Sequence, residues 1–359
     1  MRLCAILATL LFLNAAQVTR VEARPTLLFE PSTNTVLYAE DIDRPWHPAS
    51  LTKIMTAYVV FQALKAGQIT LDSKIPSSEA AHKMPPSKIG IPVGGEISVE
   101  LALRALIIKS ANDVAVMLAE AVGGTHDGFI ARMNQTAKRL GMNRTHFVNP
   151  NGLPADAQVT TARDLAILSK AVREDFPQHD HYWSMPSLRI GKVRLRSHNS
   201  LLKTFDGADG LKTGFICDSG FNIVASAARD GRRLIAIVLG ETSAQDRAIR
   251  AASLLEHGFN TYGWKLFFKS TTLRDLPIAR ETLSAPSIRD SIPSSSCNPT
   301  LARRARAERR ARRNALKKLR RAARKSKLSG QSASAATSPA TQKPQVLPGI
   351  RPSIPGPQN

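Results

Sequence analysis

The spacing of apolar residues predicts two strands near the start of the chain and a buried helix after them. PTLLFE and TVLYAE, at residues 25–30 and 35–40, are short runs of strand-forming residues separated by a turn, so we expect a β-hairpin. A helix is predicted from Ser50 to Ala66, with Gly67 as its stop. Because this segment is apolar nearly all round, the helix should be buried.

Further helical patterns follow, and the period then changes to that of strands. The expected helices cover residues 98–109, 114–124, 126–140 and 161–173. DGLKTGF, FNIVASAA and RRLIAIVLG are apolar, β-branched runs beyond residue 208, and Asp230-Gly231 predicts a hairpin turn between the last two. A closing helix is expected at about residues 243–257.

This order of elements predicts an α+β fold. Two early strands cannot bury their faces alone, so the first hairpin should join the three late strands in one mainly antiparallel, five-stranded sheet, with the helical subdomain packed against it. Residues 24–265 are expected to form this globular domain, and residues 266–300 a linker.

The first 23 residues read as a leader. Arg2 precedes an apolar run from Leu3 to Ala16, and the small residue Ala23 suits a signal peptidase. The alternative is an uncleaved anchor, but this run is shorter than the roughly 20 residues that span a bilayer. A signal peptide over residues 1–23 predicts export to the periplasm or cell envelope, which excludes cytosolic cofactors such as NAD and ATP.

The formal net charge of +22 is concentrated late in the chain. Residues 301–327 hold ten arginines and four lysines against one glutamate, a net charge of +13. We expect a basic helix here and a disordered Ser/Ala/Pro-rich tail over residues 328–359. In an exported protein, anionic lipid on the outer face of the inner membrane, or acidic wall polymers, are the expected partners, and nucleic acid is not. A solvated tail without a partner is the alternative.

Two cysteines remain after the leader, which contains Cys4. In an oxidising compartment Cys217 and Cys297 could pair and staple the tail to the domain, or stay as two free thiols. The sequence leaves both possibilities open.

The helix at Ser50 carries one lysine, Lys53, among apolar neighbours. Positions i and i+3 share a helix face, so Lys53 can reach the Ser50 hydroxyl. A lysine can take the proton of a serine only if desolvation or nearby positive charge lowers its pKa, and this apolar helix supplies the desolvation. The alternative is a serine N-cap followed by a lysine that extends to the surface.

Two further motifs favour the catalytic interpretation. In Ser110-Ala111-Asn112, side chains two apart in an extended connection point the same way, so a hydroxyl and an amide can enter one cleft. In the strand run Lys212-Thr213-Gly214, the glycine allows a ligand backbone to approach closely. Taken alone, each motif is weak: S-x-N is more typical of an ordinary interhelical turn with Asn112 or Asp113 as the helix cap, and K-T-G also suits a solvated strand lysine beside a bulge.

S-x-x-K, S-x-N and K-T-G, in this order on a helix, a loop and a strand, form a strong joint signal. The arrangement resembles the penicillin-recognising serine acyl transferases, and most of all the low-molecular-weight penicillin-binding proteins, the serine-type D-Ala-D-Ala carboxypeptidases of peptidase family S11. The runs FVNPNGLP and FNIVASAARDGRRLIAIVLGE support the likeness, which covers about residues 25–262. It implies a β-lactamase/transpeptidase-like catalytic domain over residues 24–265.

The resemblance also implies a role for each catalytic residue. Ser50 would attack the carbonyl between two D-alanines, Lys53 would be its general base, and Ser110 would relay the proton to the leaving amine. Water would then hydrolyse the acyl-enzyme and release D-alanine. No metal or other cofactor is implied, and β-lactam antibiotics would acylate the same serine.

A second set of residues would bind the substrate, a peptidoglycan pentapeptide stem. Asn112 would hydrogen-bond the substrate amide, and Lys212 with Thr213 would draw its terminal carboxylate. Gly214 would admit the substrate backbone, and the amides of Ser50 and Phe215 would form the oxyanion hole, in which one donor typically contributes about 2.7 to 4 kcal/mol.

The chain departs from the family in several places. Many relatives have glycine in place of Ala111 and a polar residue in place of Phe215, and many carry a C-terminal β-domain, whereas nothing after residue 270 reads as one. Three alternatives stay open: a D,D-endopeptidase, a serine β-lactamase, and a non-hydrolytic wall-binding protein whose tail is the working part. Against the β-lactamase, no E-x-x-L-N segment of the class A type follows Ser110-Ala111-Asn112.

Overall fold

The computed structural model describes residues 24–265, 271–279, 284–298, 300–301, 304, 307–308 and 310–319. The chain divides into two units, Met1–Cys297 and Asn298–Asn359. The predicted leader and the predicted disordered tail both lie outside the described residues. Among the helices that are described, none is both long and apolar enough to cross a membrane.

The first unit is built on a five-stranded antiparallel sheet, which confirms the predicted fold class. Its order is β2-β1-β9-β8-β7. The strands are β1 (Thr26–Glu30), β2 (Thr35–Glu40), β7 (Ala208–Ile216), β8 (Gly220–Arg229) and β9 (Arg232–Glu241). The early hairpin therefore joins the late strands through the β1–β9 pair, where Thr26 faces Val238.

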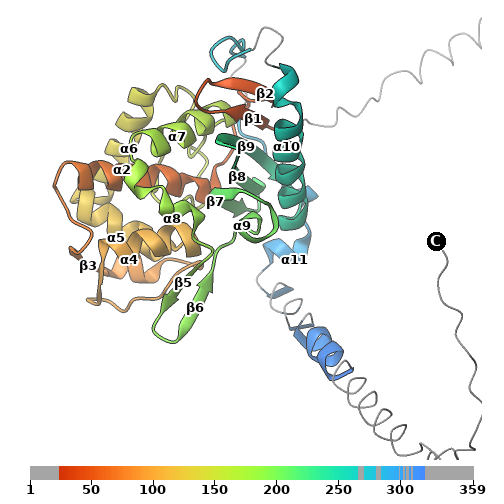
Figure 1. The fold of residues 1–359 in the computed structure, drawn as a ribbon. Coiled ribbons are helices and arrows are strands. Elements are labelled where there is room, and N and C mark those ends of the chain that lie inside the picture. The colour runs from red at the N-terminus through yellow and green to blue at the C-terminus, as the bar shows by residue number, and fades with distance from the viewer. Residues whose placement is uncertain are drawn as a thin grey trace, which may run out of the picture. The chain divides into compact units, whose positions relative to one another are not determined.

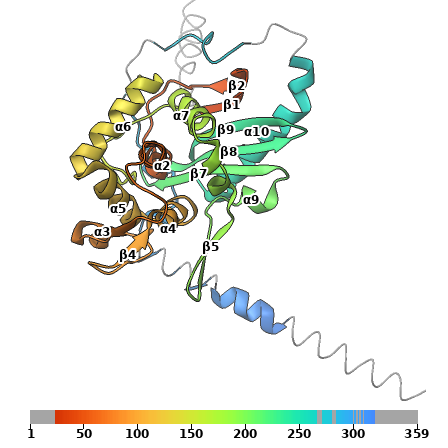
Figure 2. The same ribbon diagram turned by 60° about the vertical axis from the view of Figure 1, so that its left-hand side comes forward.

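Helices cover both faces of the sheet (Figures 1 and 2). On one face lies α10 (Ala244–Lys265), and Leu255 from this helix packs in one cluster with Leu28 of β1 and Ile223 of β8. The other face carries the helical block: η1 (Ala49–Leu51), α2 (Thr52–Lys65), α4 (Val99–Arg104), η2 (Ala105–Lys109), α5 (Asn112–Gly123), α6 (His126–Leu140) and α7 (Ala162–Glu174).

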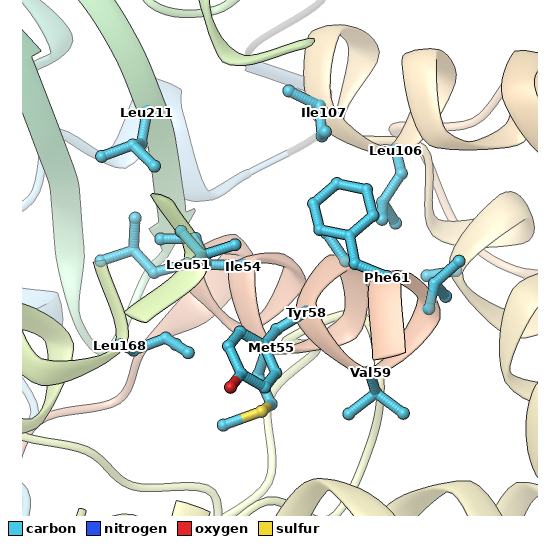
Figure 3. Close-up of a cluster of buried hydrophobic side chains, with 14 of the residues drawn as sticks. Leu51, Ile54, Met55, Tyr58, Val59, Phe61, Leu106, Ile107, Leu168 and Leu211 are labelled. Atoms are coloured by element: carbon cyan, nitrogen blue, oxygen red, sulfur yellow. The ribbon is translucent and has the colours of Figure 1, made fainter. Parts of the chain in front are cut away.

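Helix α2 lies at the centre of this block, as its all-round apolar composition predicts. Figure 3 shows its side chains directed toward several neighbours, among them Leu106 of η2, Leu168 of α7 and Leu211 of β7. Burial on every side excludes water from the helix that follows the candidate nucleophile.

Several details differ from the prediction. Ser50 lies in a 3₁₀ turn, and the α-helix begins only at Thr52. The expected helix over 98–109 is an α-helix followed by a π-helical stretch, and α10 continues to Lys265, beyond its expected end. The pattern also missed short elements: β3 (Lys74–Pro76), α3 (Glu79–Lys83), β4 (Glu96–Ser98), η3 (Pro177–His179), α8 (His181–Ser184), β5 (Ser187–Ile190), β6 (Val193–Arg196) and α9 (Leu201–Thr204).

The segment expected to be a linker contacts the globular unit where it is described. Leu273 is buried, its amide donates to the Asn34 carbonyl, and its own carbonyl accepts from buried Arg163. Farther along, η4 (Arg289–Ser291) and α11 (Ser294–Cys297) precede Asn298, where the second unit begins. Cys297 is disulfide-bonded to Cys217, which resolves the choice that the sequence left open.

Candidate active site

Ser50 is presented by a tightly packed turn. Ala49 has a left-handed backbone conformation, with φ +47°, and its carbonyl lies against the α-carbon of Gly152. A Cβ atom at position 152 would lie 1.8 Å from that oxygen, and one at Gly214 would lie 3.1 Å from the amide nitrogen of Ser50. Glycine at both places allows the turn that contains Ser50 to pack between β7 and the loop that contains residue 152.

Lys53 lies one helical turn beyond Ser50 and is completely buried. Its Nζ lies 2.9 Å from Ser50 Oγ, 2.8 Å from Asn112 Oδ1 and 2.5 Å from the Asn151 carbonyl oxygen. Burial, and then the positive charge of Lys212, lower the pKa of Lys53 well below its ordinary value. The predicted serine–lysine pair is therefore formed, in an environment that favours the neutral amine.

The S-x-N segment is not the extended connection that we expected. Ser110 has a left-handed backbone, with φ +59°, and Asn112 is the first residue of α5. The two side chains consequently have different partners: Asn112 holds Lys53, and its Nδ2 donates to the Pro85 carbonyl. A π-helical end followed by a strained serine is a costly backbone arrangement of a kind that clusters at functional sites.

Ser110 is paired with the second buried lysine. Lys212 Nζ donates to Ser110 Oγ at 2.9 Å and to the Thr213 carbonyl at 2.9 Å. Burial and the charge of Arg247 lower the pKa of Lys212 to about 7. The site thus consists of two serine–lysine pairs, Ser50 with Lys53 and Ser110 with Lys212, coupled by the repulsion between the two lysines.

The K-T-G strand forms the remaining side. Lys212, Thr213, Gly214 and Phe215 are consecutive residues of β7, which lies at one edge of the sheet. The ring of Phe215 stacks on that of Phe221 in the neighbouring strand, with centroids 4.2 Å apart. The aromatic residue that replaces the family's polar one is therefore packed against β8.

The structure adds residues that sequence reasoning did not single out. Asn151 holds Lys53 through its carbonyl, and the buried Asp113 carboxylate accepts from the Ile89 and Gly90 amides. Arg247 of α10 is buried beside Lys212. The FVNPNGLP run contains Asn151, but a backbone contact leaves no side-chain signal, and an arginine on an amphipathic helix reads as exposed.

In the part of the chain that the structure describes, no group of three or more histidine, cysteine, aspartate or glutamate side chains is placed to hold a metal ion. The chemical groups present are hydroxyls, amines and backbone amides. Such groups suit acyl transfer through a serine.

A serine held by a buried lysine at the edge of an antiparallel sheet, with S-x-N and K-T-G beside it, defines the penicillin-recognising class of proteins. The family model described as D-alanyl-D-alanine carboxypeptidase matches residues 13–243, a range that includes all eight predicted site residues. The chain belongs to this family.

Individual relatives agree with this assignment. D-alanyl-D-alanine carboxypeptidase DacC from Escherichia coli (strain K12) is 37% identical over 266 residues, covering 72% of this chain and 65% of that protein. Penicillin binding protein 5 from Haemophilus influenzae is similar in structure, with a TM-score of 0.64 and 32% identity over 68% of this chain and 73% of that one.

A third relative was solved with a β-lactam bound. It is penicillin-binding protein D2 from Listeria monocytogenes in the cefotaxime-bound form, with a TM-score of 0.60 and 31% identity, covering 68% of this chain and all of that one. The first curated relatives are matched over less than two thirds of their own length.

Proposed function

We propose that the protein is an exported, penicillin-sensitive serine-type D-Ala-D-Ala carboxypeptidase that removes the terminal D-alanine from peptidoglycan pentapeptide stems. The observation that carries the proposal is the buried Ser50–Lys53 pair, 2.9 Å apart, in which the lysine pKa is lowered. Family membership supports the choice of substrate.

In this mechanism Ser50 Oγ attacks the carbonyl carbon between the two D-alanines while neutral Lys53 takes its proton. The oxyanion of the tetrahedral intermediate accepts hydrogen bonds from the amides of Ser50 and Phe215. Ser110, which already accepts a hydrogen bond from Lys212, gives its hydroxyl proton to the leaving D-alanine amine and receives in exchange the proton that Lys53 took from Ser50. Water then attacks the acyl-enzyme and regenerates Ser50.

The substrate's carboxylate is assigned to Lys212 and Thr213, and its backbone to the space beside Gly214. A carboxylate next to Lys212 raises the pKa of that lysine again and keeps it charged during turnover. Asn112 is assigned to the substrate amide. For this role its side chain has to exchange the hydrogen bond to Lys53 or to Pro85 for one to the substrate.

The decisive experiment compares the wild-type protein with Ser50→Ala, using a fluorescent penicillin and a pentapeptide that ends in D-Ala-D-Ala. We expect stable labelling and D-alanine release by wild type, and neither by the variant. Equal labelling of both proteins, or no release by wild type, would overturn the proposal. Rapid penicillin hydrolysis without stable labelling would favour a β-lactamase, and cleavage of cross-linked peptides alone would favour an endopeptidase.

We also propose that the basic segment binds an anionic surface of the envelope, either lipid head groups or wall polymers. Residues 310–319 are helical and exposed, and they include Arg310, Arg312, Arg313, Lys317 and Lys318. Each basic residue near an anionic membrane is worth about 1 kcal/mol. Truncation after residue 300 should weaken sedimentation with anionic vesicles or wall fragments and leave pentapeptide turnover intact. Unchanged sedimentation with both would refute this role.

A further inference from the structure

The disulfide lies at the end of the strand that carries K-T-G. Cys217 directly follows β7 and comes two residues after Phe215. Its partner, Cys297, is 80 residues later in the chain. The bridge therefore fastens residues 284–297 to the turn that joins β7 to β8.

Noncovalent contacts fasten the same turn. The amide of Ile288 donates to the Asp218 carbonyl at 2.8 Å. The Asp218 carboxylate accepts from the Ser287 hydroxyl at 2.9 Å and from two nitrogens of Arg289, each at 3.1 Å. Gly220 packs so closely that an added Cβ would lie 2.6 Å from the Ile288 side chain. The turn is thus matched to this segment by shape as well as by charge.

The same turn is also contacted by the segment that leads to Ser50. Trp46 Nε1 donates to the Ser219 carbonyl at 3.1 Å, and Asn222 Nδ2 donates to the Ser219 hydroxyl at 2.9 Å. Trp46 is buried and lies four residues before Ser50. The β7–β8 turn therefore contacts both the segment that leads to Ser50 and residues 284–297.

Strand β7 needs such support because it is an edge strand and, among the strands that the structure describes, pairs with β8 alone. We propose that residues 284–297 are a positioning segment: by fixing the β7–β8 turn through Cys297 and Arg289, they hold the Phe215 amide in place as an oxyanion donor. This inference rests on the proposed function, which assigns that role to the amide. A donor displaced by about 1 Å can cost a catalyst 100-fold.

The test uses the full chain and its Cys217→Ala/Cys297→Ala and Arg289→Ala variants. Fluorescent penicillin first counts the competent sites in each preparation, and D-alanine release is then expressed per labelled site. We expect kcat per site to fall about tenfold in the double variant, with KM changed less than about twofold, because the oxyanion contact belongs to the transition state. In Arg289→Ala, kcat per labelled site should fall only about twofold, because the ion pair between Arg289 and Asp218 is partly exposed.

Arg274→Ala is the matched control, because Arg274 is also exposed and lies before the positioning segment, outside residues 284–297. Its kcat per labelled site should equal that of wild type. If both test variants keep the wild-type kcat per labelled site, even with fewer labelled sites, the segment serves stability alone and the inference is wrong. If wild type itself releases no D-alanine, the proposed function fails, and the positioning role is then tested by the rate of penicillin acylation. Labelling of the double variant that is about tenfold slower supports the positioning role. An unchanged labelling rate overturns it.

Discussion

The Nζ of Lys53 lies 2.9 Å from the Oγ of Ser50, and no part of the lysine reaches solvent. Two further acceptors, Asn112 Oδ1 and the Asn151 carbonyl, favour a proton on this nitrogen. Burial and the charge of Lys212 oppose it more strongly, and the pKa of Lys53 is lowered as a result. The lysine is therefore held in a fixed position by groups that do not keep it charged.

A lysine that acts as a base cannot be replaced by a cation that keeps its proton. Lys53→Arg should lower the rate of penicillin acylation by about 100-fold or more, because a guanidinium does not accept the serine proton. Stopped-flow or gel-based labelling measures this rate. Lys65→Arg, at the exposed end of the same helix, is the control and should acylate at the wild-type rate. Rapid acylation of Lys53→Arg would assign proton transfer to another group.

The pH profile should reflect both lysines. Deprotonation of Lys53, whose pKa lies well below its ordinary value, should raise kcat/KM, and loss of the charge on Lys212 above its pKa of about 7 should lower it. The bound carboxylate stabilises charged Lys212, so the alkaline limb of kcat should lie at higher pH than that of kcat/KM. If the alkaline limbs of kcat and kcat/KM coincide, Lys212 does not bind the substrate carboxylate.

The same buried charge should reduce stability. The pKa of Lys212 falls from 10.5 unfolded to about 7 folded, so the unfolded chain holds the extra proton between these values. Stability then rises with pH across this window, and the cost is largest below pH 7. Lys212→Met should therefore raise the free energy of unfolding by about 1 to 2 kcal/mol at pH 6, and by less at pH 9. Denaturant titrations at both pH values measure this. A gain that is equal at both pH values would contradict the assigned cause.

Gly152 gives a test of the nucleophile turn. Gly152→Ala places a Cβ against the Ala49 carbonyl, so it should displace Ser50 and abolish most penicillin labelling. Gly141→Ala is the matched control, because Gly141 also has a positive φ, +84°, but open space around it. Both variants should lose about 1 kcal/mol of stability from backbone strain, and Gly152→Ala should lose more because its Cβ displaces the Ala49 carbonyl. Labelling that falls equally in both would mean that strain, and not the contact with Ala49, is responsible.

The sequence predicts the sheet and the buried helix because their signals are local. The Asp230-Gly231 turn and the apolar surroundings of Lys53 are both readable within a few residues. The hydrogen-bond partners of Lys53 could not be predicted in this way. Asn112 and Asn151 lie 59 and 98 residues away, and one of them acts through its backbone, so only the folded chain brings them to the lysine.

The S-x-N segment shows a second limit. Side-chain direction was inferred from an extended backbone, but the left-handed conformation of Ser110 turns its hydroxyl to Lys212 while Asn112 faces Lys53. Non-glycine residues rarely adopt this conformation, and tertiary packing imposes it here. The pairing of Cys217 with Cys297 was likewise undecidable, since spacing alone does not place two thiols together.

The most direct test of the account is the protonation state of Lys53 in the resting enzyme. Lysine labelled with ¹³C at Cε, assigned by comparison with Lys53→Arg, reports the titration of this side chain by NMR. The account predicts that Lys53 loses its proton at a pH well below the ordinary lysine pKa of 10.5. A Lys53 that remains protonated to above pH 10 would contradict it, even if penicillin still acylates Ser50.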